Sequence, residues 1–234
     1  MGLREKQKGK RREQILDAAR RLIRATGGTD FPMRRLAAEA EVGLVTPYNL
    51  FGSKSGVLYA LLNESLERLD RAVDVPASAK PVDAVLELAG IAADIYAADP
   101  AFYRPLIQCV LGVRDVEHRP RAIERSQRLW SRTVAAAMRG DLLARSVDTE
   151  MLARQLMITF IGVLDLWVHE DLDDDAFRAQ SLYGSALLVL AHASPSARAR
   201  LQERVRAIER RLPRRLAGST ARGGTQTKKR RRAA

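Results

Sequence analysis

The sequence predicts an all-α fold in which a small N-terminal helical domain precedes a larger helical domain. Apolar residues recur at spacings of three and four along most of the 234 residues, which is the period of an amphipathic helix. No stretch alternates for long as a half-buried strand would, and runs of β-branched residues are absent. Glycine and proline interrupt the periodic segments at points that suit helix ends. With 46% apolar residues, the chain can bury a sizeable core.

The first predicted helix covers about residues 11–26. Its apolar positions lie on one side, with arginine and glutamate between them, and they comprise Ile15, Leu16, Ala19, Leu22 and Ile23. Gly27 and Gly28 follow directly, and glycine just past the last helical turn is a common helix end.

Two short helices and a longer one come next, at about 33–40, 44–51 and 54–73. Asp30 or Phe31 stands at the predicted cap of the first, and Pro32 suits its first turn. The break at 41–43 is short, and Ser53 is placed to cap the third of these helices. Two short helices joined by a tight turn predict a helix-turn-helix.

Beyond a break at 76–81 the pattern remains helical. We expect further helices near 82–98, 100–113, 118–139, 148–170, 174–193 and 196–212. The final residues are almost wholly small, polar or basic and cannot bury enough apolar surface to fold, so we expect disorder there. The predicted organisation is a basic arm (1–12), a small domain that contains the helix-turn-helix (13–62), a larger helical domain (63–213) and a disordered basic tail (214–234).

The formal net charge of +12 is concentrated at the two ends of the chain. Residues 1–12 hold six basic residues and one acidic residue, and residues 198–234 hold fourteen and two, so the body between them is mildly acidic. Basic ends on an acidic body favour arms that contact a polyanion, and the alternative is a pair of solubilising tails.

Several function classes are disfavoured by what the sequence lacks. The start is polar and basic, and no apolar run approaches the ~20 residues of a membrane helix, so we expect a cytoplasmic protein without membrane association. His118, His169 and His192 are scattered without ligand spacing, so we expect no metal site. No catalytic set and no glycine-rich phosphate loop is visible, so we expect neither enzymatic activity nor a cofactor.

Residues 12–62 resemble the DNA-binding domain of the tetracycline-repressor (TetR) family. The matching stretches are Arg12-Glu13-Gln14-Ile15-Leu16-Asp17-Ala18-Ala19, Leu36-Ala37-x-x-Ala40-x-Val42, Thr46-x-Tyr48-x-x-Phe51-x-Ser53-Lys54 and Leu58. About a fifth of the chain carries the resemblance, and the rest agrees only in being helical and of similar length. The resemblance implies a homodimeric regulator, most often a repressor, that binds a palindromic operator in double-stranded DNA and is released by a small molecule. When bound to DNA it would be associated with the nucleoid.

The resemblance also assigns roles to individual side chains. Thr46, Tyr48 and Lys54 would contact phosphates, and Arg34, Leu44, Val45 and Asn49 would lie on the side that faces the bases. The chemistry of these residues suits those roles: Leu44 and Val45 could contact thymine methyl groups, and Asn49 could bond an adenine edge. For Tyr48 and Lys54 the alternatives are a core aromatic and a solvated lysine.

Three residues depart from the family pattern. Glu41 replaces the usual turn glycine, so a positive φ there would strain the backbone by about 1 kcal/mol or more. Pro47 lies inside the recognition helix and should remove one backbone hydrogen bond. Pro32 replaces a hydroxyl residue, so we expect one cap or phosphate contact to be lost.

The larger domain is rich in aromatic and other bulky apolar residues. Core packing is the simpler interpretation of such residues, but the resemblance implies a cavity between helices for a mostly apolar, unidentified effector. The candidate lining residues are Tyr96, Phe102, Tyr103, Leu106, Trp130, Met157, Phe160 and Trp167.

Segments 148–170 and 174–193 resemble the family's dimer-forming helices. Their apolar area is expected from Leu152, Leu156, Phe177, Leu182, Leu188 and Val189, with Gly184, Ser185 and Ala186 allowing a close approach of helices. Two rival functions stay open: a small-molecule-binding protein with a vestigial DNA-binding domain, and an architectural DNA-binding protein that relies on its basic ends. An enzyme is a more distant third.

Overall fold

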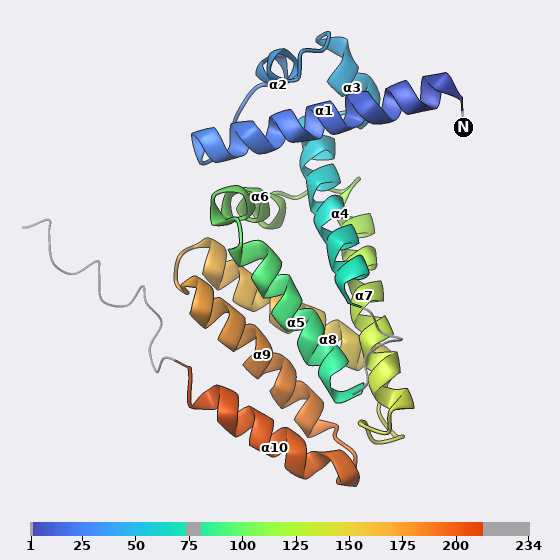
Figure 1. Ribbon diagram of the computed structural model, residues 1–234, viewed down its shortest axis with the longest axis vertical. Helices are drawn as coiled ribbons and strands as arrows, with labels where there is room; N and C mark the ends of the chain where they lie inside the picture. The colour runs from blue at the N-terminus through green and yellow to red at the C-terminus, as the bar shows by residue number, and fades with distance from the viewer. Residues whose placement is uncertain (1, 74–80, 213–234) are drawn as a thin grey trace, which may run out of the picture.

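A computed structural model describes residues 2–73 and 81–212, and within them the chain forms ten α-helices and no sheet (Figure 1). The helices are α1 (Leu3–Thr26), α2 (Met33–Glu39), α3 (Val45–Phe51), α4 (Lys54–Ala72), α5 (Pro81–Ala97), α6 (Pro100–Gly112), α7 (Arg119–Arg139), α8 (Thr149–Val168), α9 (Asp174–Ala191) and α10 (Pro195–Glu209). The predicted disordered tail, 214–234, lies outside the described residues.

The N-terminal head consists of α1, α2, α3 and the first half of α4. Its core forms where one side of α1 meets the short helices, and Ile15, Leu16, Ile23 and Leu36 are almost wholly inaccessible to solvent. Figure 1 shows α2 and α3 on the side of α1 that faces away from the rest of the molecule. The functional surface of the head is therefore presented at one end of the protein.

The long helix α4 belongs to both parts of the molecule. Near its start it packs on α1 and α3, and further along it packs on α5, α6 and α7 (Figure 1). Val57, Leu58 and Leu61 near the start and Leu66 and Leu69 near the end are all buried. Any displacement of the second half of α4 is thus transmitted to the head.

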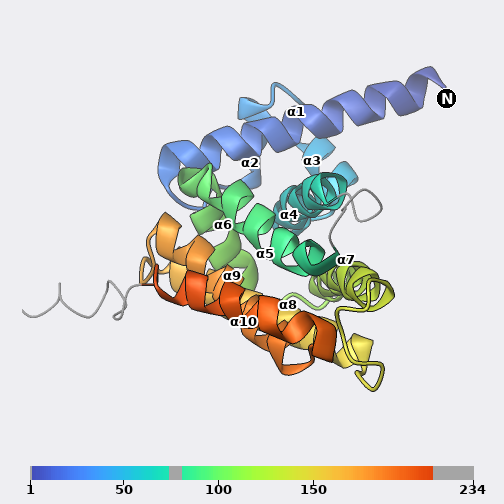
Figure 2. The ribbon, with the colours of Figure 1, turned by 60° about the horizontal axis from the view of Figure 1, so that its bottom comes forward.

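The body is a helical bundle around α8 and α9. Trp167 of α8 and Phe177 of α9 are fully buried and stack with ring centroids 4.9 Å apart. The last helix, α10, lies across α9 near α5, where Val205 and Ile208 are buried against Leu86 (Figure 2).

From the sequence we expect no apolar segment long enough to span a membrane, and one helix contradicts that expectation by its length. Among the described helices, α8 is long and apolar enough to cross a bilayer, but half of it is buried inside the structure. Its apolar residues Leu156, Val163 and Trp167 pack within the bundle, as expected of a core helix.

The predicted helix boundaries agree with the structure to within about two residues, except at the end of α10, which stops at Glu209 rather than near 212, and at the start of α1. Helix α1 begins at Leu3 rather than near Arg11, and residues 4–14 are all exposed. No proline interrupts this segment, and its lysine, arginine and glutamine residues are good helix formers that offset Gly9, so the helix continues past the end of its apolar stripe.

Glu41 has the positive φ that its place in the turn suggested. Its φ is 53°, in the left-handed region, and it ends α2 where the chain turns toward α3. A residue with a Cβ is strained there by about 1–2 kcal/mol. The tight helix-turn-helix geometry is retained at this cost.

Replacing Glu41 with glycine should stabilise the protein. The strain energy that is relieved is larger than the free-energy cost of the extra conformational entropy that glycine gives the unfolded chain. The free energy of unfolding, measured by urea denaturation, should therefore rise by up to about 1 kcal/mol. Ala40 has φ of −87°, so Ala40→Gly is the matched control and should destabilise the protein. Equal destabilisation by both substitutions would refute the assignment of strain to Glu41.

Candidate nucleic-acid interface and internal cavity

One side of α3 exposes a set of residues that a soluble protein ordinarily covers. Leu44 is 50% exposed, Val45 64% and Tyr48 48%, and Asn49 is exposed beside them. On the opposite side of the same short helix, Pro47 and Phe51 are buried in the head. We call Leu44, Val45, Thr46, Tyr48 and Asn49 the reading face.

Two cationic residues belong to the elements next to α3 in sequence, and Figure 1 shows α2, α3 and the start of α4 at one end of the molecule. Arg34 is the exposed second residue of α2. Lys54 is the first residue of α4, and its Nζ is 4.0 Å from a carboxylate oxygen of Asp30. Ser53 caps that helix by accepting a hydrogen bond from the Gly56 amide at 3.1 Å. Together with the reading face, these residues give this end of the molecule apolar, amide, hydroxyl and cationic groups from three consecutive elements.

The two prolines near this surface have different consequences. Pro32 is itself the cap residue of α2, in place of Asp30 or Phe31, and no side chain caps this helix, as the departure from the family pattern predicted. Pro47 was predicted to remove a backbone hydrogen bond, and that prediction is wrong. The residue lies in the first turn of α3, where backbone N–H groups have no partner within the helix.

The start of α4 is joined to the body through Asp115, in the loop between α6 and α7. The Asp115 carboxylate accepts a hydrogen bond from the Ser55 hydroxyl at 2.5 Å and from the backbone amides of Glu117, at 3.0 Å, and His118, at 2.5 Å. The His118 Nδ1 lies 3.2 Å from the same carboxylate. We call Ser55, Asp115 and His118 the Asp115 contact.

Two residues of α4, Gly56 and Tyr59, allow the helix to approach His118 closely and fix the position of the His118 ring. A Cβ on Gly56 would lie 2.0 Å from the carbonyl oxygen of Phe51 and 3.2 Å from His118 Nε2, so only glycine allows this approach. Tyr59, one turn further along α4, stacks on the His118 ring with centroids 5.6 Å apart. The turn after α3 is thereby held against the body.

Hydrogen bonding from Ser55 and His118 lowers the pKa of Asp115 far below its ordinary value. Burial opposes this shift but does not overcome it, so the carboxylate is charged at neutral pH. Burial, together with the charge of Asp115, raises the pKa of the Tyr59 phenol.

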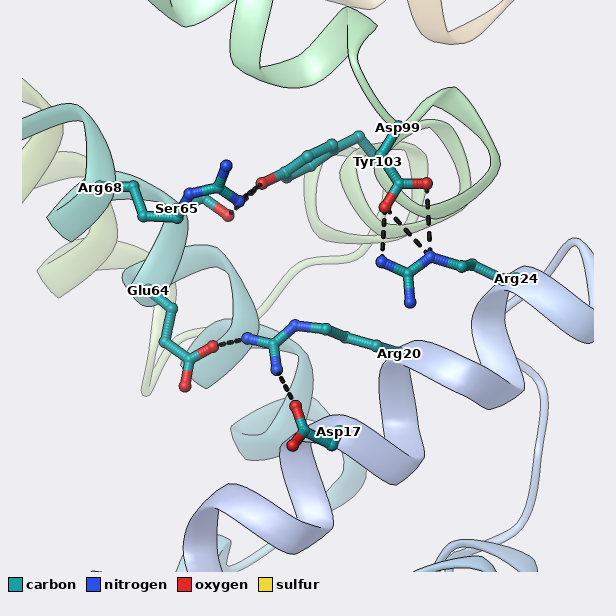
Figure 3. Close-up of polar contacts among 8 residues, drawn as sticks. All are labelled: Asp17, Arg20, Arg24, Glu64, Ser65, Arg68, Asp99 and Tyr103. Carbon is teal, nitrogen blue, oxygen red and sulfur yellow. Dashed lines mark hydrogen bonds and ion pairs between the residues drawn. The ribbon is translucent and has the colours of Figure 1, made fainter. Parts of the chain in front are cut away.

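A second joint connects the head to the body through polar contacts of α1 and α4 with α6, as Figure 3 shows. Arg24 of α1 reaches Asp99, the cap residue of α6, with Nη2 2.6 Å from a carboxylate oxygen. Arg20 pairs with Glu64 of α4, and the Tyr103 hydroxyl accepts hydrogen bonds from Ser65 and Arg68. The head is therefore fixed to the body at two separate places.

A small cavity, partly open to solvent, is lined by residues of α4, α5, α6, α7 and α8. Its volume is about 110 Å³. The lining residues are Tyr59, Leu62, Leu66, Tyr96, Ile107, Val110, Leu111, Arg119, Ala122, Ile123, Ser126, Phe160, Ile161 and Leu164. Arg119 is the main cation among them, and its Nη1 donates to the Val110 carbonyl at 3.0 Å. The wall is otherwise largely apolar.

The eight candidate pocket residues do not all meet at this cavity. Tyr96 and Phe160 line it, and full burial raises the pKa of the Tyr96 phenol. The remaining six lie in the surrounding core or at a neighbouring groove: Phe102, Tyr103, Leu106, Trp130, Met157 and Trp167. Trp130 packs behind Phe160, and the Trp167 indole N–H donates to Asp174 at 2.8 Å.

Sequence reasoning missed the Asp115 contact and most of the cavity wall. The turn in which the Asp115 carboxylate accepts the Glu117 and His118 amides is local and could have been recognised, but its bond to Ser55 joins residues sixty positions apart. Tyr59 and Arg119 gave no local signal at all. Their positions depend on how α4 and α7 are rotated in the bundle.

No family model and no curated protein matches the sequence. The structure, however, is similar to SmeT, the repressor of the Stenotrophomonas maltophilia multidrug efflux pump SmeDEF, with TM-score 0.62 and 21% identity over 80% of this chain and 92% of that one. A complex of SmeT with triclosan matches with TM-score 0.61 and 20% identity, over 80% of this chain and 93% of that one.

Two further structures agree. TylP, a TetR regulator from Streptomyces fradiae, has TM-score 0.61 and 18% identity over 87% of this chain and 97% of that one. A TetR transcriptional regulator from Rhodococcus sp. RHA1 has TM-score 0.60 and 20% identity over 76% of this chain and 94% of that one. The chain therefore has the fold of TetR-family regulators, as its N-terminal motif predicted.

The Asp115 carboxylate should make stability depend on pH. Its folded pKa is lowered, so its contribution is complete above the unfolded value near ~4 and declines as the pH falls below that value. At pH 7, Asp115→Asn should lower the free energy of unfolding by about 1–3 kcal/mol, and this deficit should shrink at pH 3.

Glu117→Gln is the matched control for this measurement. The Glu117 side chain is 77% exposed, so its removal should change the free energy of unfolding little at either pH. A deficit in Asp115→Asn that stays the same from pH 7 to pH 3 would contradict the role given to the charge.

Proposed function

We propose that this chain is a TetR-family transcription regulator, a repressor that binds a palindromic DNA operator as a homodimer and is released by a small, largely apolar molecule. In this proposal residues 13–62 bind DNA, residues 63–213 bind the effector and form the dimer, and the protein acts in the cytoplasm, on the nucleoid.

The observation that carries the proposal is the reading face. The seven-residue helix α3 and its cap residue Leu44 leave three apolar side chains, Leu44, Val45 and Tyr48, about half exposed or more, so their apolar surface is not buried by this protomer. In a major groove, Leu44 and Val45 contact thymine methyl groups and Asn49 pairs with an adenine edge. Thr46, Tyr48, Lys54 and Arg34 surround them with groups that bind phosphate or guanine.

The dimer is proposed to form through the outer face of α8 and α9. Met151 is 56% exposed, Ile158 50% and Leu187 41%, and Gly162 is also exposed on α8. Near Gly184 the two helices cross closely, since a Cβ there would lie 2.8 Å from Thr159. These residues replace four of those expected from the sequence, because Leu152, Leu156, Phe177 and Val189 are buried within the same protomer.

A two-fold dimer through this face presents two copies of α3. In such regulators the two recognition helices enter successive major grooves, so the half-sites lie about one turn of DNA apart, ~34 Å, and the operator is palindromic. We propose the same spacing and two-fold symmetry for the operator of this protein.

The effector is proposed to enlarge the cavity lined by Tyr96 and Phe160. At about 110 Å³ this cavity is well below the roughly 300–1,000 Å³ of ordinary ligand pockets. A ligand of ordinary size must therefore displace wall residues, and SmeT, of the same fold, forms a complex with triclosan. In this proposal the conformation with the small cavity binds DNA, and the conformation with the enlarged cavity binds the effector.

Displacement of the wall reaches the head through two residues. Tyr59 stacks on the ring of His118. Arg119 is the next residue after His118, and it donates a hydrogen bond to the Val110 carbonyl near the end of α6. Both adjoin the Asp115 contact, which bonds Ser55 next to the phosphate-contacting Lys54. A ligand that binds the enlarged cavity more tightly shifts the population away from the DNA-binding arrangement.

The direct test is selection of duplexes by the purified chain from a library randomised over about three helical turns. The expected product is a palindrome with half-site centres about one turn apart, ~10 base pairs. Enrichment of no sequence would reject specific regulation. It would favour one of the two rivals, a vestigial DNA-binding domain or architectural DNA binding.

Tyr48 and Asn49 should differ in the kind of DNA binding they support. Tyr48→Ala removes a phosphate contact and should weaken binding to selected and scrambled duplexes alike. Asn49→Ala should weaken only the selected duplex, by about 1–3 kcal/mol, and relax preference at one base position. Titrations of both variants on both duplexes check this, and a reversed pattern would contradict the assigned roles.

Charges on the outer face of α8 and α9 should dissociate the dimer. Ile158→Glu combined with Leu187→Glu places like charges in the proposed interface, so light scattering should give the monomer mass. Val45→Glu is the control, because it adds a charge at an apolar side chain that is 64% exposed on the reading face. It should abolish operator binding and leave the dimer mass unchanged, whereas a dimeric double variant would exclude this face.

A further inference from the structure

The first ten residues of α1, Leu3–Arg12, form an extension that precedes the first buried residue of the helix. We call this segment the α1 extension. Every residue from Arg4 to Gln14 is exposed, and the first buried side chain of the helix is Ile15. At ~1.5 Å per residue, the extension projects about 15 Å from the head. Figures 1 and 2 both show this end of α1 running past α3.

The charge of the extension is strongly one-sided. It holds Arg4, Lys6, Lys8, Lys10, Arg11 and Arg12 against Glu5 alone. Among the described residues, the first five of these cations have no ion-pair partner. The pairs Arg4 and Lys8, and Lys6 and Lys10, are four residues apart, a spacing at which like charges destabilise a helix. A polyanion alongside the helix would remove this repulsion.

One contact fixes the base of the extension to the recognition helix. The Arg12 guanidinium lies over the Phe51 ring, 4.6 Å from its centroid. Phe51 is the last residue of α3. The extension thus starts beside the C-terminal end of α3, at a residue on the side of that helix opposite the reading face.

We infer that the α1 extension lies along the phosphate backbone of the duplex that α3 reads, and that it contributes contacts independent of sequence. This inference rests on the proposed function. The length of the extension corresponds to about four base pairs at ~3.4 Å each, enough for several of its cations to reach phosphates. Such contacts add affinity and salt dependence but no base preference.

The test compares two full-length variants that lose the same charge. One carries Arg4→Gln, Lys6→Gln, Lys8→Gln and Lys10→Gln, and glutamine retains helix propensity. The other carries Arg198→Gln, Arg204→Gln, Arg206→Gln and Arg210→Gln, four exposed positions on or at the end of α10, far from α3 (Figure 1). The probe is the duplex selected by the unaltered chain, titrated over a range of KCl concentrations.

The first variant should bind about tenfold or more weakly at physiological salt and keep the same preference over scrambled duplex. The slope of log affinity against log salt should become shallower by about 0.9 for each lost contact, hence by about 2 or more for a dimer. The α10 variant should keep the slope of the unaltered chain, because its charges are screened beyond ~8 Å.

Amide exchange gives a second measurement. The amides of residues 4–12 should become protected when the unaltered chain binds the duplex, since DNA would order this exposed helix. An unchanged slope in the first variant, an equal loss in both variants, or no added protection would each overturn the inference while leaving sequence-specific binding intact. Failure of the unaltered chain to prefer any duplex would instead reject the proposed function, and this inference with it.

Discussion

The structure depends on α4 being one uninterrupted helix shared by two parts of the molecule. Its first half completes the core of the head, and its second half completes the wall of the body. Because a helix of nineteen residues transmits displacement rather than absorbing it, the head cannot turn independently of the body. The two polar joints, at Asp115 and at Asp99, lie on different elements and restrict the remaining freedom of the head.

The small apolar cavity is where the proposed function places a change of packing. A core packed to ordinary density has few voids, so a void bounded by Tyr96, Phe160 and α4 is a place where a ligand could enter between helices. Two of its wall residues, Tyr59 and Arg119, contact or adjoin His118 of the Asp115 contact. In the proposed function this proximity would couple the packing around the cavity to the position of α3.

Helix positions were predictable from the sequence because their causes are local. Ser53 caps α4, Pro100 begins α6 and Gly27 ends α1, each through the conformation of one or two residues. The cavity wall and the proposed dimer face were less predictable, because they depend on the rotation of each helix about its axis. Leu152 and Ile158 lie on the same apolar helix, yet one is buried at 4% exposure and the other is half exposed. Only packing against α7 and α9 distinguishes them.

Residues that break local rules occur in both parts of the molecule. In the head, Glu41 has a strained backbone and α2 has no side-chain cap. In the larger domain, Asp141 and Glu170 also have a positive φ, and α6, α7 and α10 have no side-chain cap. Backbone strain and missing caps therefore do not distinguish the proposed DNA-binding end. What is particular to that end is that Leu44, Val45 and Tyr48, three exposed apolar side chains, lie within five consecutive residues, an arrangement for which a partner, rather than the isolated fold, compensates.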